Sequence, residues 1–329
     1  MTLLAPTMQS FFTVRLTAQR NASPNTVAAY RDAFRLLLGF VQEARGVSPA
    51  KLRLEDLDAA TIGQFLDHLE SSRGASIKTR NSRLAAIHSL YRFAAMQHPE
   101  HASLIQRVLA IPAKRAPRPL ISYLTTVEID ALLAAPDVTT RIGRRDRALL
   151  AVVVHTGLRA SELVGLRCSN VAFGTGAHVD CIGKGRKQRS TPISVETARV
   201  LRSWMDEAGG QPEDPLFPGP RGGPLTRDGL SKIISRHAAT ASTSCPSMAQ
   251  KKVSPHVLRH SCAMQLLNAE VDVAVIALWL GHESIRTTDV YQHADMALKE
   301  RALARVPQRS TSKGRYRPSD PLLGFLEAL

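Results

Sequence analysis

The stretch HTGLRASEL at residues 155–163 places an arginine between the end of one helix and the start of the next. The apolar run before it predicts a buried helix that Gly157 ends. A new helix is expected to begin near Ala160, so that Arg159 lies at a helix N-terminus, where backbone N–H groups favour an anion. An arginine is always charged and can bind two phosphate oxygens at once. The simpler interpretation of Arg159 alone is an ion pair with Glu162.

Two strand-like segments follow, at 179–182 and 189–193, and flank the turn GKGR at 183–186. This pattern predicts a β-hairpin. Lys184 at its tip is able to enter a DNA groove and to protonate an oxygen leaving group. The alternative is that the basic residues of this hairpin only bind backbone phosphates. We favour that alternative for three of them: Arg186, Lys187 and Arg189.

A third motif lies on a helix that Ser254-Pro255 is expected to cap. His256 and Arg259 are three residues apart on this helix, so both project from one face. Such a pair holds a phosphate and exchanges protons, although chance supplies His-x-x-Arg in many proteins. Past the next predicted helix, His282 follows Gly281. It is able to add a hydrogen bond to the phosphate, and alone it would be a helix-capping residue.

Tyr291 is the candidate nucleophile. Its phenol has a pKa near 10 and needs cations and a base to be activated. A phosphotyrosine ester would store the energy of the broken DNA bond. A lone helical tyrosine usually packs in a core, but the neighbours of Tyr291 are polar and make a poor core environment. They are Thr287, Thr288, Asp289, Gln292 and His293.

The overall charge favours a polyanionic partner. The chain has 329 residues, 43 Lys and Arg against 28 Asp and Glu, and a net charge of +15. A balance this basic points first to nucleic acid, and otherwise to a solvated surface. The four cysteines form no Cys-x-x-Cys pair, which argues against a zinc knuckle or zinc ribbon. No export signal and no apolar run of about 18 residues is evident, which predicts a cytoplasmic protein without a membrane span.

The first third of the chain has the pattern of a helical bundle. Ser23-Pro24 caps a helix with apolar residues at every third or fourth position, and Gly46 ends it. Further helices are predicted at 59–72, from Ser76 onward, and at 102–109. Short connections between them indicate a small all-α domain. Four cations of the helix after Ser76 either face DNA or are ordinary solvent charges: Lys78, Arg80, Arg83 and Arg92.

The remainder divides into a linker, a mixed domain and a tail. Three prolines break the helical pattern between 112 and 125, and three cations there suit a linker that crosses a phosphate backbone, or a plain spacer. The cations are Lys114, Arg115 and Arg118. Helices at 126–134, 144–155, 254–268 and 273–280, with the hairpin, make a mainly α domain with a small antiparallel β-sheet. After a basic stretch, an apolar helix is expected at Leu322–Leu329, and it docks on its own domain or on a neighbouring subunit.

Together these motifs resemble the tyrosine recombinase (phage integrase, Xer-like) family. The matching text is TGLRASEL at 156–163, GKGRK at 183–187, SPHVLRH at 254–260, LGH at 280–282 and TTDVYQH at 287–293. The resemblance covers nearly the whole chain and fills all six positions of the family's active-site pattern. It implies a helical core-binding (SAM-like) domain at 1–111, a linker at 112–125, a mixed α/β catalytic domain at 126–306 and a tail at 307–329.

The resemblance also implies the roles of the six residues. Arg159 and Arg259 would bind the scissile phosphate, Lys184 would protonate the 5′-oxygen, and Tyr291 would form a 3′-phosphotyrosine. His256 would act as acid or base, and His282 as a hydrogen-bond donor. Four protomers would hold two DNA duplexes and exchange strands through a Holliday junction, as a homo-tetramer or with related recombinases. No metal or other cofactor is implied.

Three other functions compete with this interpretation. A type IB topoisomerase shares the chemistry but relaxes supercoils as a monomer. A non-catalytic DNA-binding accessory factor would not need Tyr291. A zinc hydrolase would use His256 and His260, which are spaced as helical zinc ligands are. However, Arg259 stands where such a site needs a glutamate, and it repels a cation.

Overall fold

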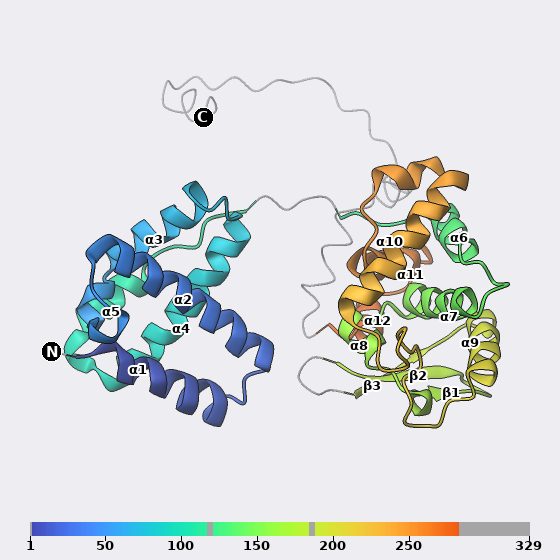
Figure 1. Ribbon diagram of the computed structural model, residues 1–329, viewed down its shortest axis with the longest axis horizontal. Coiled ribbons are helices and arrows are strands. Elements are labelled where there is room, and N and C mark those ends of the chain that lie inside the picture. The colour runs from blue at the N-terminus through green and yellow to red at the C-terminus, as the bar shows by residue number, and fades with distance from the viewer. Residues whose placement is uncertain (1, 117–120, 184–187, 283–329) are drawn as a thin grey trace, which may run out of the picture. The chain divides into compact units, whose positions relative to one another are not determined.

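The structure, a computed structural model, describes residues 2–116, 121–183 and 188–282. It divides into two compact units, Met1–Pro119 and Leu120–Leu329 (Figure 1). The boundary falls inside the segment 112–125 that the sequence predicts to be a linker. The described residues are mainly helical and carry one small antiparallel sheet, which confirms the predicted fold class.

The first unit is helical in its described residues. Its α-helices are α1 (Leu4–Ser10), α2 (Pro24–Arg45), α3 (Ala59–Ser71), α4 (Ile77–Gln97) and α5 (Ala102–Leu109). A π-helix, η1 (Phe11–Gln19), continues α1, and short 3₁₀ turns lie at Pro49–Lys51, Leu54–Leu57 and Pro99–His101. The sequence pattern predicted α2 to α5 but not α1 or η1. No side chain caps the start of α1, so the local signal for it is weak, whereas Leu4, Phe11 and Leu16 are buried in the tertiary core.

Local caps explain where the predicted helices begin and end. The Ser23 hydroxyl accepts a hydrogen bond from the Thr26 backbone N–H at 3.2 Å, and Ser76 accepts in the same way from Thr79. Gly46 ends α2 in the left-handed conformation, with φ +67°. The core between these helices is apolar, and Tyr91 at its centre donates its hydroxyl to the Leu57 carbonyl.

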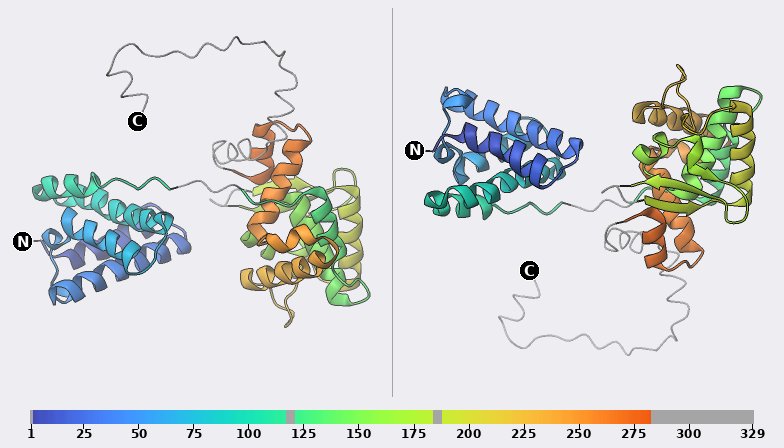
Figure 2. Two further views of the ribbon diagram at one scale, coloured as in Figure 1. Left: turned by 90° about the horizontal axis from the view of Figure 1, so that it is seen from above. Right: turned by 90° about the horizontal axis from the view of Figure 1, so that it is seen from below.

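The second unit contains the sheet. Its α-helices are α6 (Thr126–Ala134), α7 (Arg141–Thr156), α8 (Ala160–Val164), α9 (Val195–Ala208), α10 (Arg227–Ser244), α11 (Pro255–Asn268) and α12 (Val273–Leu280). The strands β1 (Val171–Ala172), β2 (His178–Ile182) and β3 (Gln188–Pro192) pair antiparallel in that order. Short 3₁₀ turns are η5 (Cys168–Asn170) and η7 (Pro246–Gln250). The hairpin formed by β2 and β3 is therefore present as predicted, and β2 contacts α8. Figure 2 shows the second unit, with its strands in yellow-green, from two further sides.

Helix α7 forms the centre of the second unit and packs against α6, α9 and α11. It begins three residues before its predicted start because Thr140 caps it, accepting from the Gly143 N–H at 3.0 Å. Its C-terminal half is almost entirely buried, as its apolar run predicts. Helix α9, which the sequence pattern did not predict, covers α7 and contributes the buried Leu201 and Trp204.

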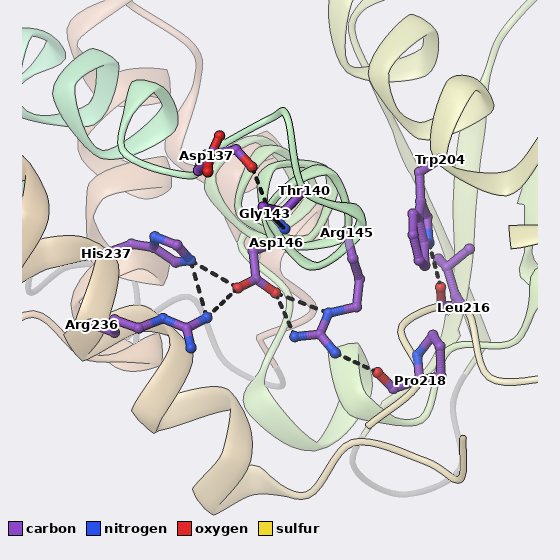
Figure 3. A network of polar contacts seen from close by, with 10 residues as sticks. All are labelled: Asp137, Thr140, Gly143, Arg145, Asp146, Trp204, Leu216, Pro218, Arg236 and His237. Carbon is purple, nitrogen blue, oxygen red and sulfur yellow. Dashed lines mark hydrogen bonds and ion pairs between the residues drawn. The ribbon is translucent and has the colours of Figure 1, made fainter. Parts of the chain in front are cut away.

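A buried carboxylate fixes α7 against α10 (Figure 3). Asp146 is fully buried and accepts hydrogen bonds from Arg145 on its own helix and from Arg236 and His237 on α10. Burial alone would raise the pKa of Asp146, but the bonds from His237 and Arg145 outweigh it and hold that pKa below its ordinary value. The network holds the helix whose end forms the candidate site.

Within the described ranges, no helix is both long and apolar enough to cross a bilayer.

Candidate active site

Both arginines of the predicted site are held at the C-terminus of α12. The Leu280 carbonyl accepts from Nη2 of Arg259 at 2.6 Å, and the next carbonyl, that of Gly281, accepts from Nη2 of Arg159 at 2.9 Å. Carbonyls at a helix C-terminus lack helical partners and carry partial negative charge, so they suit cations. Two guanidinium groups that are far apart in the sequence are thus brought to one place.

Gly157 allows this close approach. It ends α7 with φ +61°, and its carbonyl accepts from Nη1 of Arg259 at 2.7 Å. A Cβ at this position would lie 2.5 Å from Cδ2 of Leu280, so the Leu280 side chain would have to move, and the left-handed conformation itself would be strained. Arg259 is only 4% exposed, and its two terminal nitrogens join the end of α7 to the end of α12.

Glu162 is a buried carboxylate between two arginines. Its oxygens accept from the backbone N–H and from Nη1 of Arg159, both at 2.8 Å. They also accept from Nη2 and Nη1 of Arg189, at 2.9 and 3.2 Å. Burial alone would raise the pKa of Glu162, but the bonds from Arg159 and the charge of Arg189 hold it below its ordinary value. The ion pair considered as the simpler interpretation of Arg159 therefore exists, within a larger cluster.

Arg189 was assigned from the sequence to backbone-phosphate binding, and the structure argues against that assignment. Its side chain is 12% exposed and points to Glu162. In the register of the hairpin, Arg189 pairs with the buried Cys181, so it lies on the inward face of the sheet. The alternation of buried Val179 and Cys181 was a signal for this placement. This alternation could not predict the direction of Arg189 until the pairing register of the two strands was known, because a shift of one residue turns a side chain to the opposite face of the sheet.

Two histidines beside the arginines are neutral at ordinary pH. Burial, followed by the charges of Arg259 and Arg159, lowers the pKa of His282 to about 4. Burial, followed by His256 and Arg259, lowers the pKa of His260 to about 4 as well. A neutral imidazole still donates one hydrogen bond, which is what the predicted role of His282 requires.

His256 lies at the exposed side of this cluster, and its ring centroid is 4.0 Å from that of His260. Four of the six residues predicted to be catalytic are therefore in one neighbourhood: Arg159, His256, Arg259 and His282. The other two, Lys184 and Tyr291, lie outside the described residues, as do Arg118, Arg186, Lys187 and the tail segment Leu322–Leu329. In the described ranges no third His, Cys, Asp or Glu joins His256 and His260 as a metal-ligand group.

The first unit presents some of the cations predicted to contact DNA. Lys78 and Arg115 are exposed. Arg83 is half-buried and donates to the Ala29 carbonyl at 3.0 Å, and Lys114 forms an ion pair with Glu70 at 2.8 Å. DNA contact by these four residues stays a prediction.

The ion pair of Arg80 with Glu70 argues against a direct phosphate contact for this residue, because the carboxylate balances its charge. Arg80 is 5% exposed, donates to the Pro112 carbonyl at 3.0 Å and lies 3.5 Å from Glu70. Asn81 beside it bonds both the N–H and the carbonyl of Lys114. These contacts hold the start of the linker segment on α4, which is the role that the structure indicates for Arg80.

The two depressed histidine pKa values predict acid sensitivity of the DNA-free protein. The unfolded chain protonates its histidines near pH 6.5 and the folded chain only near pH 4, so between these values the unfolded state binds more protons. The free energy of unfolding therefore falls as pH drops through this window, and these groups have no effect above it. Thermal unfolding between pH 7.5 and 4.5 measures the slope.

The matched variant is His260→Asn/His282→Asn, which is expected to show a shallower loss of melting temperature across the same window. His178→Asn, on β2, serves as the control and should keep the slope of the parent protein. Equal slopes for the double variant and the parent would contradict the prediction.

Comparisons with known proteins match both units of the chain. The sequence model of the phage integrase family matches residues 122–297, and that of the phage integrase N-terminal SAM-like domain matches residues 10–98. A putative integrase/recombinase, y4rC, of Sinorhizobium fredii is 51% identical over 99% of this chain and 98% of its own. The tyrosine recombinase XerD of Pseudomonas aeruginosa is 34% identical over 84% of this chain and 88% of its own.

Solved structures show the same fold. The post-cleavage complex of the XerH site-specific recombinase with a palindromic difH substrate superposes with a TM-score of 0.71 and 23% identity, covering 87% of this chain and 81% of XerH. A lambda integrase dimer bound to a COC′ core site superposes with a TM-score of 0.64 and 17% identity, over 94% of this chain and 80% of the integrase.

Proposed function

The chain belongs to the phage integrase family and is a site-specific DNA recombinase, and we propose that six of its residues carry out the cleavage and rejoining of DNA. They are Arg159, Lys184, His256, Arg259, His282 and Tyr291. The observation that carries the proposal is that the carbonyls of Leu280 and Gly281 hold Arg259 and Arg159 at one helix end, with His282 next in the chain.

This arrangement suits the charge that develops during attack on phosphorus. Negative charge grows on the two non-bridging oxygens in the transition state, and fixed cations at those oxygens stabilise it without further reorganisation. Arg159 and Arg259 are already fixed by helix-end carbonyls and by Glu162, so little ordering remains when DNA binds. The neutral His282 adds a hydrogen-bond donor beside them.

The proposed reaction replaces one phosphoester bond with another, so no energy source is needed to rejoin the DNA. The phenol oxygen of Tyr291 attacks phosphorus and His256 accepts its proton, while the bond to the 5′-oxygen breaks and Lys184 protonates that oxygen. The product is a 3′-phosphotyrosine and a free 5′-hydroxyl. The 5′-hydroxyl of a second duplex then attacks the phosphotyrosine and releases Tyr291. Two such strand transfers, one in each direction, form a Holliday junction, and a second pair resolves it.

Lys184→Ala is expected to slow cleavage and to be rescued by a better leaving group. A 5′-thiolate needs little protonation, so a site in which sulfur replaces the bridging 5′-oxygen does not depend on a general acid. Covalent capture by Lys184→Ala should approach that of the parent protein on the sulfur-bridged site. Lys187→Ala, three residues further along the chain, is the control and should weaken binding similarly on both sites. No gain on the sulfur-bridged site would assign Lys184 to phosphate binding.

The assembly that we propose is a tetramer of protomers on two paired DNA sites, or a mixed tetramer with related recombinases. Its support is the reaction itself, because exchange of two strands in each of two duplexes uses four nucleophiles. The lambda integrase relative is a dimer on one core site, which is half of such an assembly. We propose that the tail segment Leu322–Leu329 links neighbouring protomers. We also propose that the protein acts in the cytoplasm, where DNA is accessible.

A two-site assay tests the recombinase against its rivals. The protein's own site is first selected from random duplexes by covalent capture, and two copies are then placed as direct repeats in a supercoiled plasmid. A recombinase deletes the intervening DNA as a circle only when both sites are present. A type IB topoisomerase would relax plasmids that lack the site, and an accessory factor would bind without any covalent capture.

A further inference from the structure

Arg189 lies inside the candidate active site although it belongs to the hairpin that the sequence predicts to contact DNA. Both of its terminal nitrogens bond to the carboxylate of Glu162. Its guanidinium also packs on the backbone of Gly281, where an added Cβ would lie 2.3 Å from Nη1. Gly281 is the residue whose carbonyl holds Arg159 and which precedes His282. Arg189 thus contacts two of the groups that position Arg159.

The carboxylate of Glu162 creates an electrostatic problem that Arg189 resolves. Glu162 binds Arg159 through one side-chain bond and one backbone bond, and its side chain is only 3% exposed. A buried carboxylate next to a phosphate-binding arginine neutralises that arginine and repels the phosphate. With Arg189 present, the cluster of Glu162, Arg159 and Arg189 keeps one net positive charge. Without it, the pair of Glu162 and Arg159 is neutral.

The geometry separates Arg189 from an ordinary phosphate-binding residue. The terminal nitrogens of Arg259 bond neutral carbonyls, and Arg159 gives one terminal nitrogen to Glu162 and keeps 31% of its side chain exposed. Both terminal nitrogens of Arg189 instead bond the carboxylate of Glu162, which compensates its charge, and its side chain is 12% exposed. A bidentate pair with a carboxylate is also stronger and more directional than a surface contact.

We propose that Arg189 is a positioning residue, which occupies Glu162 so that the charge of Arg159 remains available to the scissile phosphate. The inference rests on the proposed function, in which Arg159 binds that phosphate. Arg189 acts through Glu162 and touches no reacting atom. Its removal therefore lowers the rate of cleavage and leaves DNA affinity largely unchanged, the opposite of what loss of a phosphate-binding cation does.

The test compares Arg189→Gln, Glu162→Gln and the double variant on a suicide site at saturating DNA. Arg189→Gln is expected to cleave about tenfold to a hundredfold more slowly than the parent, because Glu162 then competes with the phosphate for Arg159. The double variant, which removes the competing carboxylate, is expected to recover most of this loss. Arg167→Gln, at an exposed arginine paired with Glu213, is the control and should match the parent.

A charge-free scissile linkage supplies a readout that a purely structural role would not change. In a methylphosphonate, a methyl group replaces one non-bridging oxygen and the linkage is neutral, so the electrostatic need for Arg159 is smaller. The deficit of Arg189→Gln should therefore shrink on this substrate to about threefold or less. An equal deficit on both substrates, or a double variant no faster than Arg189→Gln, would overturn the inference.

Three further measurements keep the outcome decisive. Arg189→Lys keeps a cation beside Glu162 and should cleave faster than Arg189→Gln, even where the glutamine variant is poorly folded. If Arg189→Lys is folded and loses as much cleavage rate as Arg189→Gln, the inference is overturned. Rescue of Arg189→Gln by the sulfur-bridged site would also overturn it, because Arg189 would then act through Lys184. Arg159→Ala separates the two proposals: normal cleavage by it defeats the proposed function, whereas its inactivity beside a fully active Arg189→Gln defeats only this inference.

Discussion

Tyr291→Phe is expected to abolish covalent capture of a nicked suicide site while it retains binding to the same DNA. The phenol oxygen is the only atom of that side chain that can form an ester with phosphorus, and phenylalanine has the same ring without it. The Arg159 and Arg259 cluster does not depend on this oxygen for its bonds to Glu162, Gly157 and the α12 carbonyls. The loss should therefore be confined to the chemical step.

Gel electrophoresis under denaturing conditions measures the covalent adduct, and a mobility shift under native conditions measures binding. Tyr123→Phe is the matched control, since Tyr123 is another tyrosine of the second unit and should keep its capture activity. Full capture by Tyr291→Phe would falsify the assignment of the nucleophile. Loss of capture together with loss of binding would contradict the expected separation of the two steps.

Replacement of Arg259 by alanine is expected to cost roughly 3 kcal/mol or more of transition-state stabilisation, by analogy with removal of one oxyanion donor, which is a hundredfold or greater loss in rate. Arg259 is 4% exposed and its terminal nitrogens bond the Gly157 and Leu280 carbonyls, so its guanidinium is held in place before DNA arrives. The loss of Arg159 should have an effect of similar size.

Because alanine also leaves the Gly157 and Leu280 carbonyls without these donors, folding is measured beside the rate. Arg259→Lys retains the charge but not the planar fork, and it should still lose most of the rate because the single ammonium nitrogen cannot span the positions that the two terminal nitrogens of Arg259 occupy. Arg199→Ala, at an exposed arginine of α9, is the control. An unchanged single-turnover cleavage rate in folded Arg259→Ala would remove Arg259 from the catalytic set.

Local sequence signals predicted much of the second unit, for reasons that act within a few residues. Ser254-Pro255 starts α11 because the serine hydroxyl accepts from the Val257 N–H. Gly157 and Gly281 end α7 and α12 because both adopt the left-handed conformation that glycine tolerates. The sequence analysis missed α1, which has no side-chain cap and depends on tertiary burial. It also missed α9, although the Ser194 hydroxyl caps its start and Gly209 ends it in the left-handed conformation.

The sequence by itself therefore determined the family, the helices around the site and which residue types can bind and attack a phosphate. It did not determine where Arg80 and Arg189 point. A cation in a basic stretch has the same local pattern whether it faces DNA or a buried carboxylate, and the choice depends on Glu70 and Glu162, which other elements of the fold place beside it. Only the tertiary structure decided that the end of α12 accepts both Arg159 and Arg259, because that site is made of backbone carbonyls, which every sequence has and no motif marks.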